Sequence, residues 1–451
     1  MADDNKQFNK MTSTPVSKLV ITLAIPSIIS MLVTNIYNLA DTAFVGTLGN
    51  SASGAVGVVF GFMAIIQAVG FMFGQGAGSI VSRLLGARKV DDAKRIASTG
   101  FFGAFFLGIL VAVICWIFID PLVYMLGSTD TIAPYAKTYI SYILLTAPFM
   151  VSSFTLNNIL RYEGKAALGM IGLLTGGLLN IAGDALLMFV FDMGIAGAGI
   201  STAVSQTISF SILLSMFLRR KTECRLSLSL VDKKIRTLGV ICGTGLPSLI
   251  RQALGSLATI LLNFEAAKWG DGDPGVAAMS IVSRVSFFIF AIALGMGQGF
   301  QPVCGYNFGA KKYLRVRQAY KVTLMLSTGV LIVLTAISLF IYEDLIRVFR
   351  NDDIVVNLAG RAFVLQSIAQ LFLAVCMVTE MLMQASGMKL KATFLSSLRG
   401  GIIFIPALFI LSNLRGMSGV QEAQPVAYVL SVIPAVILAI SFFNKLPKED
   451  E

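Results

Sequence analysis

GQGAGSIVSRLLGARK at residues 74–89 has a second copy later in the chain, GQGFQPVCGYNFGAKK at residues 297–312. In both copies GQG is followed at the same spacing by GA and then by a pair of basic residues. Another pair, IPSII at 25–29 and LPSLI at 246–250, precedes the two copies in the same order. Two matches in order, at almost equal separation, indicate that the chain consists of two related halves.

The composition is that of a membrane protein. Of the 451 residues, 56% are hydrophobic and 13% are charged, and the mean hydropathy is +0.81, whereas about a quarter of the residues in a soluble domain are charged. Stretches of roughly 20 mostly apolar residues, enough to cross the hydrocarbon core, recur with short polar breaks. We predict an all-α integral membrane protein with twelve transmembrane helices, at 19–45, 55–81, 97–119, 138–160, 168–191, 195–218, 238–267, 275–302, 320–342, 357–386, 393–412 and 426–444.

The basic residues predict the orientation in the membrane. Lys and Arg concentrate in the loops that share a side with the two ends of the chain, and loops rich in these residues face the cytoplasm. We therefore expect a multi-pass protein of the cell's inner (plasma) membrane with both termini in the cytoplasm. The net charge of +11 belongs mainly to these loops, so no nucleic-acid partner is expected. Three arginines, Arg251, Arg284 and Arg399, fall instead inside or at the ends of helices.

The repeat and the even number of spans predict two pseudo-symmetric six-helix lobes. We expect an N-lobe at 1–220 (helices 1–6), a cytoplasmic linker at 221–236 and a C-lobe at 237–451 (helices 7–12). Parallel duplication of this kind is typical of transporters. Pro26 and Pro247 interrupt the first helix of each lobe and are candidate hinges, the alternative being static kinks that packing requires.

Polar side chains stand inside three predicted spans of the first half. The first span carries a stripe with the i, i+3, i+4, i+7 spacing of one helical face, made of Thr34, Tyr37, Asn38 and Asp41. Spans five and six carry similar stripes, formed by Asn180 and Asp184 and by Thr202, Ser205, Gln206 and Ser209. Hydrogen bonding between helices explains the hydroxyl groups but not two carboxylates, because a charge at mid-bilayer costs at least about 2.5 to 3.5 kcal/mol. Gln67 and Asn157 are further candidates for the lining of the same cavity.

Asp41 and Asp184 predict a cation site. In a pocket with little water, burial and the neighbouring negative charge raise the pKa of a carboxyl group. Either acid can therefore bind and release a proton. Together they could instead hold Na⁺ with oxygens of Asn180, Tyr37 and Thr202. The chain has no histidine, so proton coupling would run through carboxylates. No cofactor is expected, because the chain has no GxxxxGK[ST] loop and its five cysteines are scattered.

In order and spacing these motifs resemble the multidrug and toxic compound extrusion (MATE) transporters, closest to the DinF-like prokaryotic branch. The resemblance runs from IPSIISMLVTNIYNLADTAFVG through the GQG repeats to NNILRYEGK (157–165) and FDMGIAGAGISTAVSQ (191–206). It implies two pseudo-symmetric lobes, V-shaped with a central cavity, which alternate between outward- and inward-facing states. It also implies export of mostly cationic or amphipathic compounds using H⁺ or Na⁺ gradients. The first-lobe cation site of that branch matches Asp41, Tyr37, Asn180, Asp184 and Thr202 here.

A site in the second lobe is the alternative that the resemblance leaves open. The other branch of the family uses a Glu on helix seven and an Asp on helix ten, and those helices carry Glu265 and Glu380 here. We expect Arg284 to form a structural ion pair with one of these acids. In the repeat Asp41 falls on Leu262, so the acid was not duplicated with the fold, which favours the first lobe.

The expected function is that of a secondary active multidrug efflux antiporter. It would export organic cations or amphipathic compounds in exchange for H⁺ or Na⁺, working as a monomer in the lipid bilayer. The alternative is a lipid or lipid-linked glycan flippase of the same wider superfamily, which would need a basic cavity for a pyrophosphate. An enzyme is not expected, because no loop has a nucleophile and base or a set of metal ligands.

Overall fold

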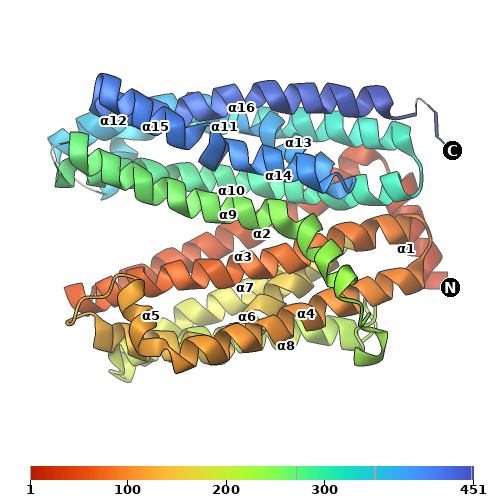
Figure 1. Cartoon of the computed structure of the whole chain (residues 1–451), viewed down its shortest axis with the longest axis horizontal. Helices are drawn as coiled ribbons and strands as arrows, with labels where there is room; N and C mark the ends of the chain where they lie inside the picture. Colours follow the sequence, from red (N-terminus) through yellow and green to blue (C-terminus); the bar gives the residue numbers. More distant parts are fainter. Residues whose placement is uncertain (1, 271, 350–351, 448, 451) are drawn as a thin grey trace. The chain divides into compact units, whose positions relative to one another are not determined.

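The computed structural model describes residues 2–270, 272–349, 352–447 and 449–450, and the side chains of all of these except residues 2–5 and 50. Within this described part every regular element is a helix (Figure 1). The elements are α1 (Ala2–Ser13), α2 (Val16–Gly46), α3 (Asn50–Gly86), α4 (Val90–Ile117), α5 (Ile119–Met125), α6 (Ala133–Tyr162), α7 (Ala166–Asp184), η1 (Ala185–Val190), α8 (Gly194–Leu218), η2 (Leu228–Leu230), α9 (Ile235–Trp269), α10 (Asp273–Gly309), α11 (Tyr313–Phe349), α12 (Asp353–Gln370), α13 (Leu373–Ala385), α14 (Lys389–Ser397), η3 (Leu398–Ile402), α15 (Phe404–Arg415) and α16 (Met417–Lys445).

The predicted all-helical membrane fold is confirmed. Among the described residues eleven helices are long and apolar enough to cross a membrane, and α12 with α13, bent by 47° where they meet, brings the number to twelve. The short helices α1 and α5 were not predicted. α1 has a mean hydropathy too low for a span, and α5, at seven residues, is too short for one.

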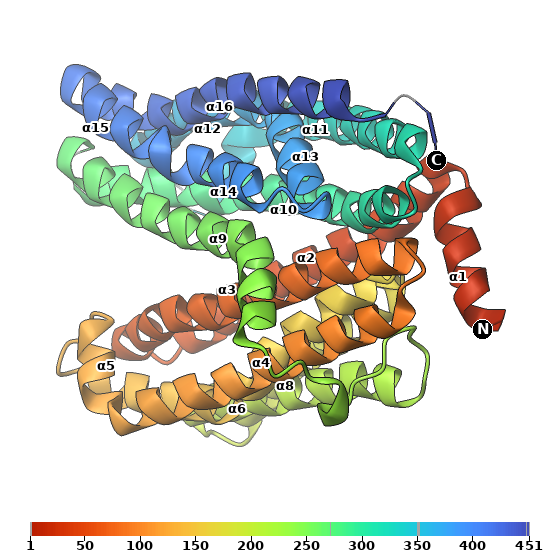
Figure 2. The ribbon, with the colours of Figure 1, turned by 45° about the vertical axis from the view of Figure 1, so that its right-hand side comes forward.

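The chain folds into two compact units, and two helices belong to both. Unit 1 consists of Met1–Thr12 and Ile29–Leu249, and unit 2 of Ser13–Ile28 and Ile250–Glu451. α2 therefore begins in unit 2 and ends in unit 1, and α9, continuous across Pro247 (Figure 2), does the reverse. Each predicted lobe is one continuous stretch of sequence. In the compact units, by contrast, the first part of α2 belongs to unit 2 and the first part of α9 belongs to unit 1.

The repeated GQG motif provides the surface on which each exchanged helix segment packs. A Cβ atom on Gly76 of α3 would lie 2.1 Å from the carbonyl oxygen of Ile241, in the first part of α9. A Cβ atom on Gly299 of α10 would lie 2.5 Å from the backbone of Ala24, in the first part of α2. Only glycine permits helix backbones to approach so closely. The motif recurs because both units need the same close contact.

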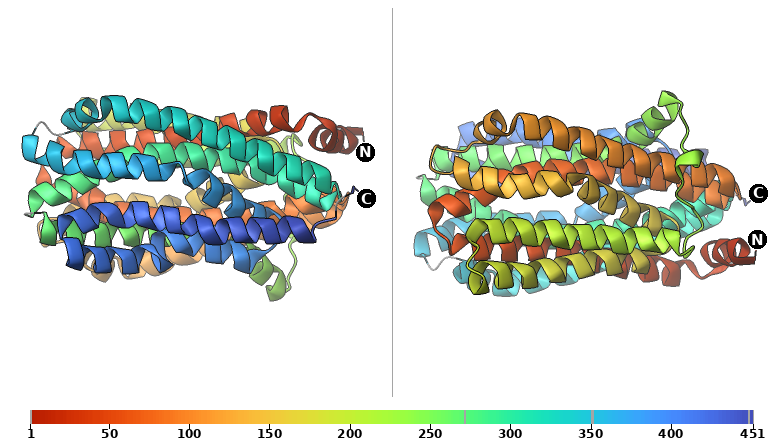
Figure 3. Two further views of the ribbon diagram at one scale, coloured as in Figure 1. Left: turned by 90° about the horizontal axis from the view of Figure 1, so that it is seen from above. Right: turned by 90° about the horizontal axis from the view of Figure 1, so that it is seen from below.

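A π-helical segment interrupts the fifth span of each unit. In unit 1, η1 follows directly on Asp184, the last residue of α7, and in unit 2, η3 contains Arg399. A π-helical segment adds a residue to the turn and changes the direction of the side chains beside it, and such segments are frequent at functional sites. The two charged side chains thus stand where the helical regularity is broken. Figure 3 shows long helices of each unit running side by side.

The predicted linker is folded onto unit 1. The buried carboxylate of Glu163, between α6 and α7, accepts hydrogen bonds of 3.0 Å from the backbone N–H groups of Glu223 and Cys224. Ser98 of α4 donates to the carbonyl oxygen of Arg225, and the N–H of Asp232 donates to Thr99. These bonds satisfy the backbone of a segment without a regular ladder of its own.

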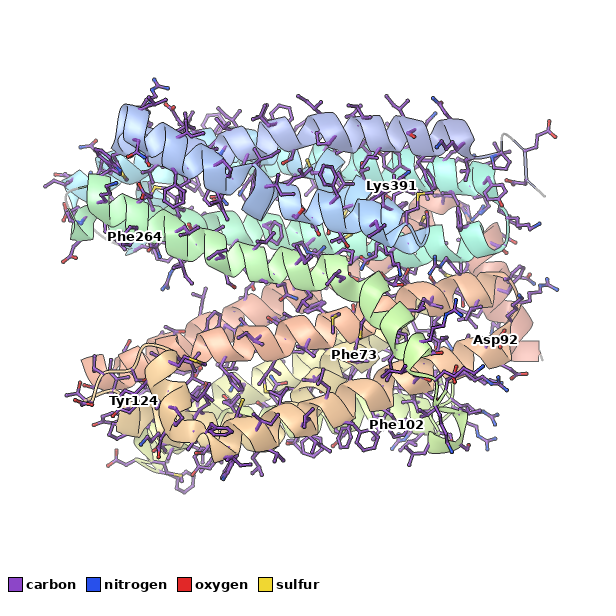
Figure 4. All side chains as sticks on the ribbon, in the orientation of Figure 1. Phe73, Asp92, Phe102, Tyr124, Phe264 and Lys391 are labelled. Atoms are coloured by element: carbon purple, nitrogen blue, oxygen red, sulfur yellow. The ribbon has the colours of Figure 1, made fainter. Side chains whose placement is uncertain are left out.

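Apolar side chains project along the outside of the helices (Figure 4). Phe106 of α4 is 56% exposed and Phe340 of α11 is 89% exposed. Large apolar side chains are exposed along most of the spans, as in a protein whose outer surface contacts lipid instead of water.

Candidate functional site

Asp41 is buried in the second part of α2. Its carboxylate Oδ2 accepts a 2.8 Å hydrogen bond from the hydroxyl of Tyr139 on α6. Tyr139 is completely buried and was not among the predicted site residues. The sequence gives no sign of its role, because Tyr139 lies in the fourth predicted span, outside the polar stripes of spans one, five and six. Its hydroxyl fixes the orientation of Asp41, because a hydrogen bond to a charged group is among the stronger ones in proteins.

Asn180, Asp184 and Thr202 form the second part of the site. The side-chain nitrogen Nδ2 of Asn180 lies 3.1 Å from Thr202 Oγ1 and 3.4 Å from Asp184 Oδ1. The hydroxyl of Ser201 donates to the main-chain carbonyl oxygen of Asn180 at 2.9 Å. Asn180 and Asp184 are four residues apart on α7, so they lie on one face and point at α8 together.

The two parts are joined into one polar cluster within unit 1. The Tyr139 hydroxyl donates to Asp41 and lies beside Thr202, and Asp41 and Asp184 interact electrostatically. Tyr37 lies beside Gln206 and within electrostatic range of Asp41. The structure thus brings together the predicted residues Asp41, Tyr37, Asn180, Asp184, Thr202 and Gln206, with Tyr139 as a further member.

The cluster has more hydrogen-bond acceptors than donors. Asp41 Oδ1, Asp184 Oδ2 and Asn180 Oδ1 are all buried without a hydrogen-bond partner. A buried acceptor without a hydrogen-bond partner destabilises the fold, and all three of these oxygen atoms need a hydrogen-bond donor or a cation. A proton on a carboxylate would supply the missing donor, and a hard cation such as Na⁺ prefers oxygen ligands of this type. The residues present therefore fit a small cation.

Glycines on α7 allow the site to be compact. A Cβ atom on Gly177 would lie 2.8 Å from Val33 of α2, and one on Gly183 would lie 2.5 Å from the hydroxyl oxygen of Ser201 on α8. Small residues at such positions let membrane helices approach closely enough for side-chain hydrogen bonds. The sequence GGLLNIAGD thus holds both the polar residues and the contacts that position them.

Other predicted cavity residues lie around the cluster in different ways. The hydroxyl of Thr34 donates to the carbonyl oxygen of Ser30 on its own helix. Asn38 and Gln67 are half-buried, and the buried Asn157 packs against Gly169 at the start of α7. As cavity-lining residues they stay predictions.

The acids of unit 2 have different partners from those expected. Trp269 donates to Glu265 at 3.0 Å, and Glu380 forms ion pairs with Arg251 and Arg399. Arg284 is exposed on α10, so the expected ion pair of Arg284 with Glu265 or Glu380 was wrong. The reason is tertiary: α9 and η3 bring two other arginines to Glu380.

The position in unit 2 that is equivalent to Asp41 is apolar. Leu262 lies in a buried cluster with Ala258, Ala266 and Val282, among other side chains of α9 and α10. A carboxylate there would have no polar partner in that cluster. The acid pair described in unit 1 was therefore not copied into this part of unit 2.

Comparison with known proteins identifies the family. The family model described as MatE matches residues 26–186 and 247–410, one segment in each half of the chain. The chain belongs to the MATE family. The two matched segments begin at Pro26 in α2 and at Pro247 in α9, which are equivalent positions in the internal repeat of this MATE protein.

Relatives of similar length support this membership. Multidrug export protein MepA of Staphylococcus aureus (strain N315) is 29% identical over 98% of this chain and 97% of its own. MepA of Staphylococcus saprophyticus is 28% identical over 94% and 93%. The fold is that of MATE crystal structures: an outward-facing multidrug resistance MATE transporter matches with a TM-score of 0.92 at 24% identity, over 97% of this chain and 98% of that one.

Proposed function

We propose that this MATE protein is a secondary active antiporter that exports organic cations or amphipathic compounds in exchange for H⁺ or Na⁺. Entry of the ion through the Asp41 and Asp184 site would drive exit of the compound. The observation that carries the proposal is the group of buried oxygen atoms without partners on Asp41, Asp184 and Asn180. The names of the Staphylococcus relatives, multidrug export proteins, support small-molecule substrates.

The charge of the site supports neutralisation by an exchangeable cation and not by a basic side chain of the protein. Among the described residues, no Lys or Arg is found with the groups that bond to either carboxylate or act on it electrostatically. Since a buried carboxylate requires a compensating charge or a proton, that charge has to come from outside the chain. An ion and a cationic substrate that compete for one such site can be exchanged across the membrane by alternating access.

The proposed setting follows from the charge distribution. We place the protein in the cell's inner (plasma) membrane with both termini in the cytoplasm, because the basic linker and the other basic loops lie on the side of the termini. The transporter would act as a monomer and without a cofactor, because the proposed site is built entirely within unit 1.

Efflux from proteoliposomes tests the proposal. The wild-type protein should move a fluorescent organic cation when an inward H⁺ or Na⁺ gradient is imposed, and separate gradients decide which ion is used. Asp41→Asn should lower this efflux by about tenfold or more, because the amide cannot exchange a proton or a charge. The matched control is Asp92→Asn, an exposed acid in the first turn of α4 (Figure 4), which should transport normally. Undiminished efflux by Asp41→Asn would remove Asp41 from the mechanism, and lipid scrambling without cation efflux would support a flippase instead.

A further inference from the structure

Unit 2 contains a buried group of three charged side chains. Glu380 of α13 is fully buried, and Arg251 of α9 and Arg399 of η3 are 9% and 6% exposed. One carboxylate oxygen of Glu380 pairs with Arg251, and the other lies 3.3 Å from Arg399 Nη2. Three different elements thus contribute to one ionic group inside the described part of unit 2.

The group carries an excess positive charge. Two guanidinium groups face one carboxylate, and a guanidinium does not lose its proton in a protein. Two other acids of the unit have partners elsewhere: Glu265 accepts from Trp269, and Glu422 pairs with Arg361 and Arg415. A buried charge without a counter-charge is strongly destabilising, so the arrangement favours binding of an anion.

The donors around the group lack acceptors. Arg399 Nε and Gln366 Nε2 are buried without a hydrogen-bond partner, and both residues are more than nine-tenths buried. Tyr428 of α16 lies beside Gln366 and within electrostatic range of Arg399. These atoms are unpartnered donors, the reverse of the unpartnered acceptors in unit 1.

We propose that Arg399, Arg251 and Gln366 form a binding site for the carboxylate of a monovalent organic anion or zwitterion. A carboxylate is planar and matches the guanidinium fork, and its single charge equals the excess charge of the group. A phosphate dianion would exceed that charge, and Glu380 would repel it. The site extends the range of ligands beyond cations, and it concerns binding alone, so it does not depend on the ion coupling proposed for unit 1.

Equilibrium binding to the full-length protein in phosphatidylcholine nanodiscs tests the proposal, without any gradient. The probes are naphthalene-2-carboxylate and its neutral isostere naphthalene-2-carboxamide, both followed by their fluorescence. The wild type should bind the carboxylate about tenfold more tightly than the carboxamide, the strength of one charge-assisted bidentate contact. Arg399→Gln should abolish this preference, and Arg399→Lys, which keeps the charge, should retain part of it.

Two further variants separate the site from general damage to the fold. Glu380→Gln raises the excess charge, so it should tighten carboxylate binding about threefold or more, a change that no folding defect produces. Arg284→Gln, the matched loss of an exposed arginine in the same unit, should bind as the wild type does. Equal affinity of the wild type for the two probes, weaker binding by Glu380→Gln, or an equal loss in Arg284→Gln would overturn the proposal. Loss of carboxylate binding when phosphatidylglycerol replaces phosphatidylcholine would assign the site to a lipid headgroup and also overturn it.

Discussion

At the scale of single residues, the chemistry of unit 1 depends on how Asp41 is held. Tyr139 leaves one oxygen of Asp41 satisfied and the other free. Asn180 does the same for Asp184, since Asp184 Oδ1 faces the Asn180 amide nitrogen and Asp184 Oδ2 has no partner. Each acid is thus oriented by a neutral donor and keeps one free oxygen for a cation.

Removing the Tyr139 hydroxyl should weaken coupling without removing the acid. Tyr139→Phe deletes a buried hydrogen bond to a carboxylate, worth about 1.5 to 3 kcal/mol, so we expect gradient-driven efflux to fall by about tenfold or more. Tyr124→Phe is the matched control, since the Tyr124 hydroxyl donates at 3.0 Å to Asp130 on the surface. Initial efflux rates in proteoliposomes measure both variants. Equal rates for the two would show that the hydroxyl does not orient Asp41.

Glu163 predicts a pH dependence of the linker. Burial raises the pKa of Glu163 from 4.5 to about 7, an effect that nearby Lys165 and the Cys224 N–H group only partly offset. The folded state therefore favours the protonated acid, so the stability that Glu163 contributes to the fold around the linker is fully present below pH 4.5 and is lost as pH rises through about 7.

Hydrogen exchange of the backbone amides of Glu223 and Cys224 measures this effect. After correction for intrinsic exchange, their protection should be lower at pH 8 than at pH 6 in the wild type. Glu163→Gln should flatten the profile, whereas Glu223→Gln, at the acid that pairs with Lys165, should preserve it. The same pH profile in Glu163→Gln and the wild type would contradict the assignment.

At the scale of elements, close helix contacts decide where the functional side chains stand. α7 reaches α2 and α8 through Gly177 and Gly183, and α3 reaches the first part of α9 through Gly76. The π-helical segments then break the helical register next to Asp184 and at Arg399. Backbone proximity and a local change of register together allow polar groups on separate helices to meet.

Substitution of Gly76 should test the contact at the repeated motif. Gly76→Ala places a Cβ atom 2.1 Å from the Ile241 carbonyl oxygen, so backbone must move, at a cost of about 1 to 3 kcal/mol. Gly57→Ala, on the same helix with nothing within 4 Å, should be neutral or stabilising by up to about 1 kcal/mol. Thermal unfolding of the purified variants should show a lower midpoint for Gly76→Ala alone. An unchanged midpoint would mean that the contact is not needed.

At the scale of the whole molecule, duplication of the fold did not duplicate the chemistry. Unit 1 holds an acid pair with free acceptors, and unit 2 holds an arginine-rich group with free donors. Leu262 replaces Asp41 in the repeat and lies in an apolar cluster. The related sequences thus maintain the same helices while the buried polar groups differ in charge.

Local sequence pattern was enough to predict the spans, the repeat and the stripe that contains Asp41. Apolar length and helical spacing are properties of one segment, so they can be read without a structure. Tyr139, and the pairing of Glu380 with Arg251 and Arg399, depend on which helices become neighbours. The exchange of the first parts of α2 and α9 between units is likewise a property of the folded chain, and no local pattern indicates it.

The central claim, that ion and substrate are exchanged through the Asp41 site, is tested most directly by measuring the counterflow itself. Proteoliposomes containing a trapped pH indicator or a Na⁺ indicator receive an outward gradient of a transported cation, with the membrane potential clamped. The account predicts that substrate movement drives H⁺ or Na⁺ in the opposite direction in the wild type, and that Asp41→Asn abolishes this ion flux. Substrate movement without any opposing ion flux, or the same flux in Asp41→Asn, would contradict it.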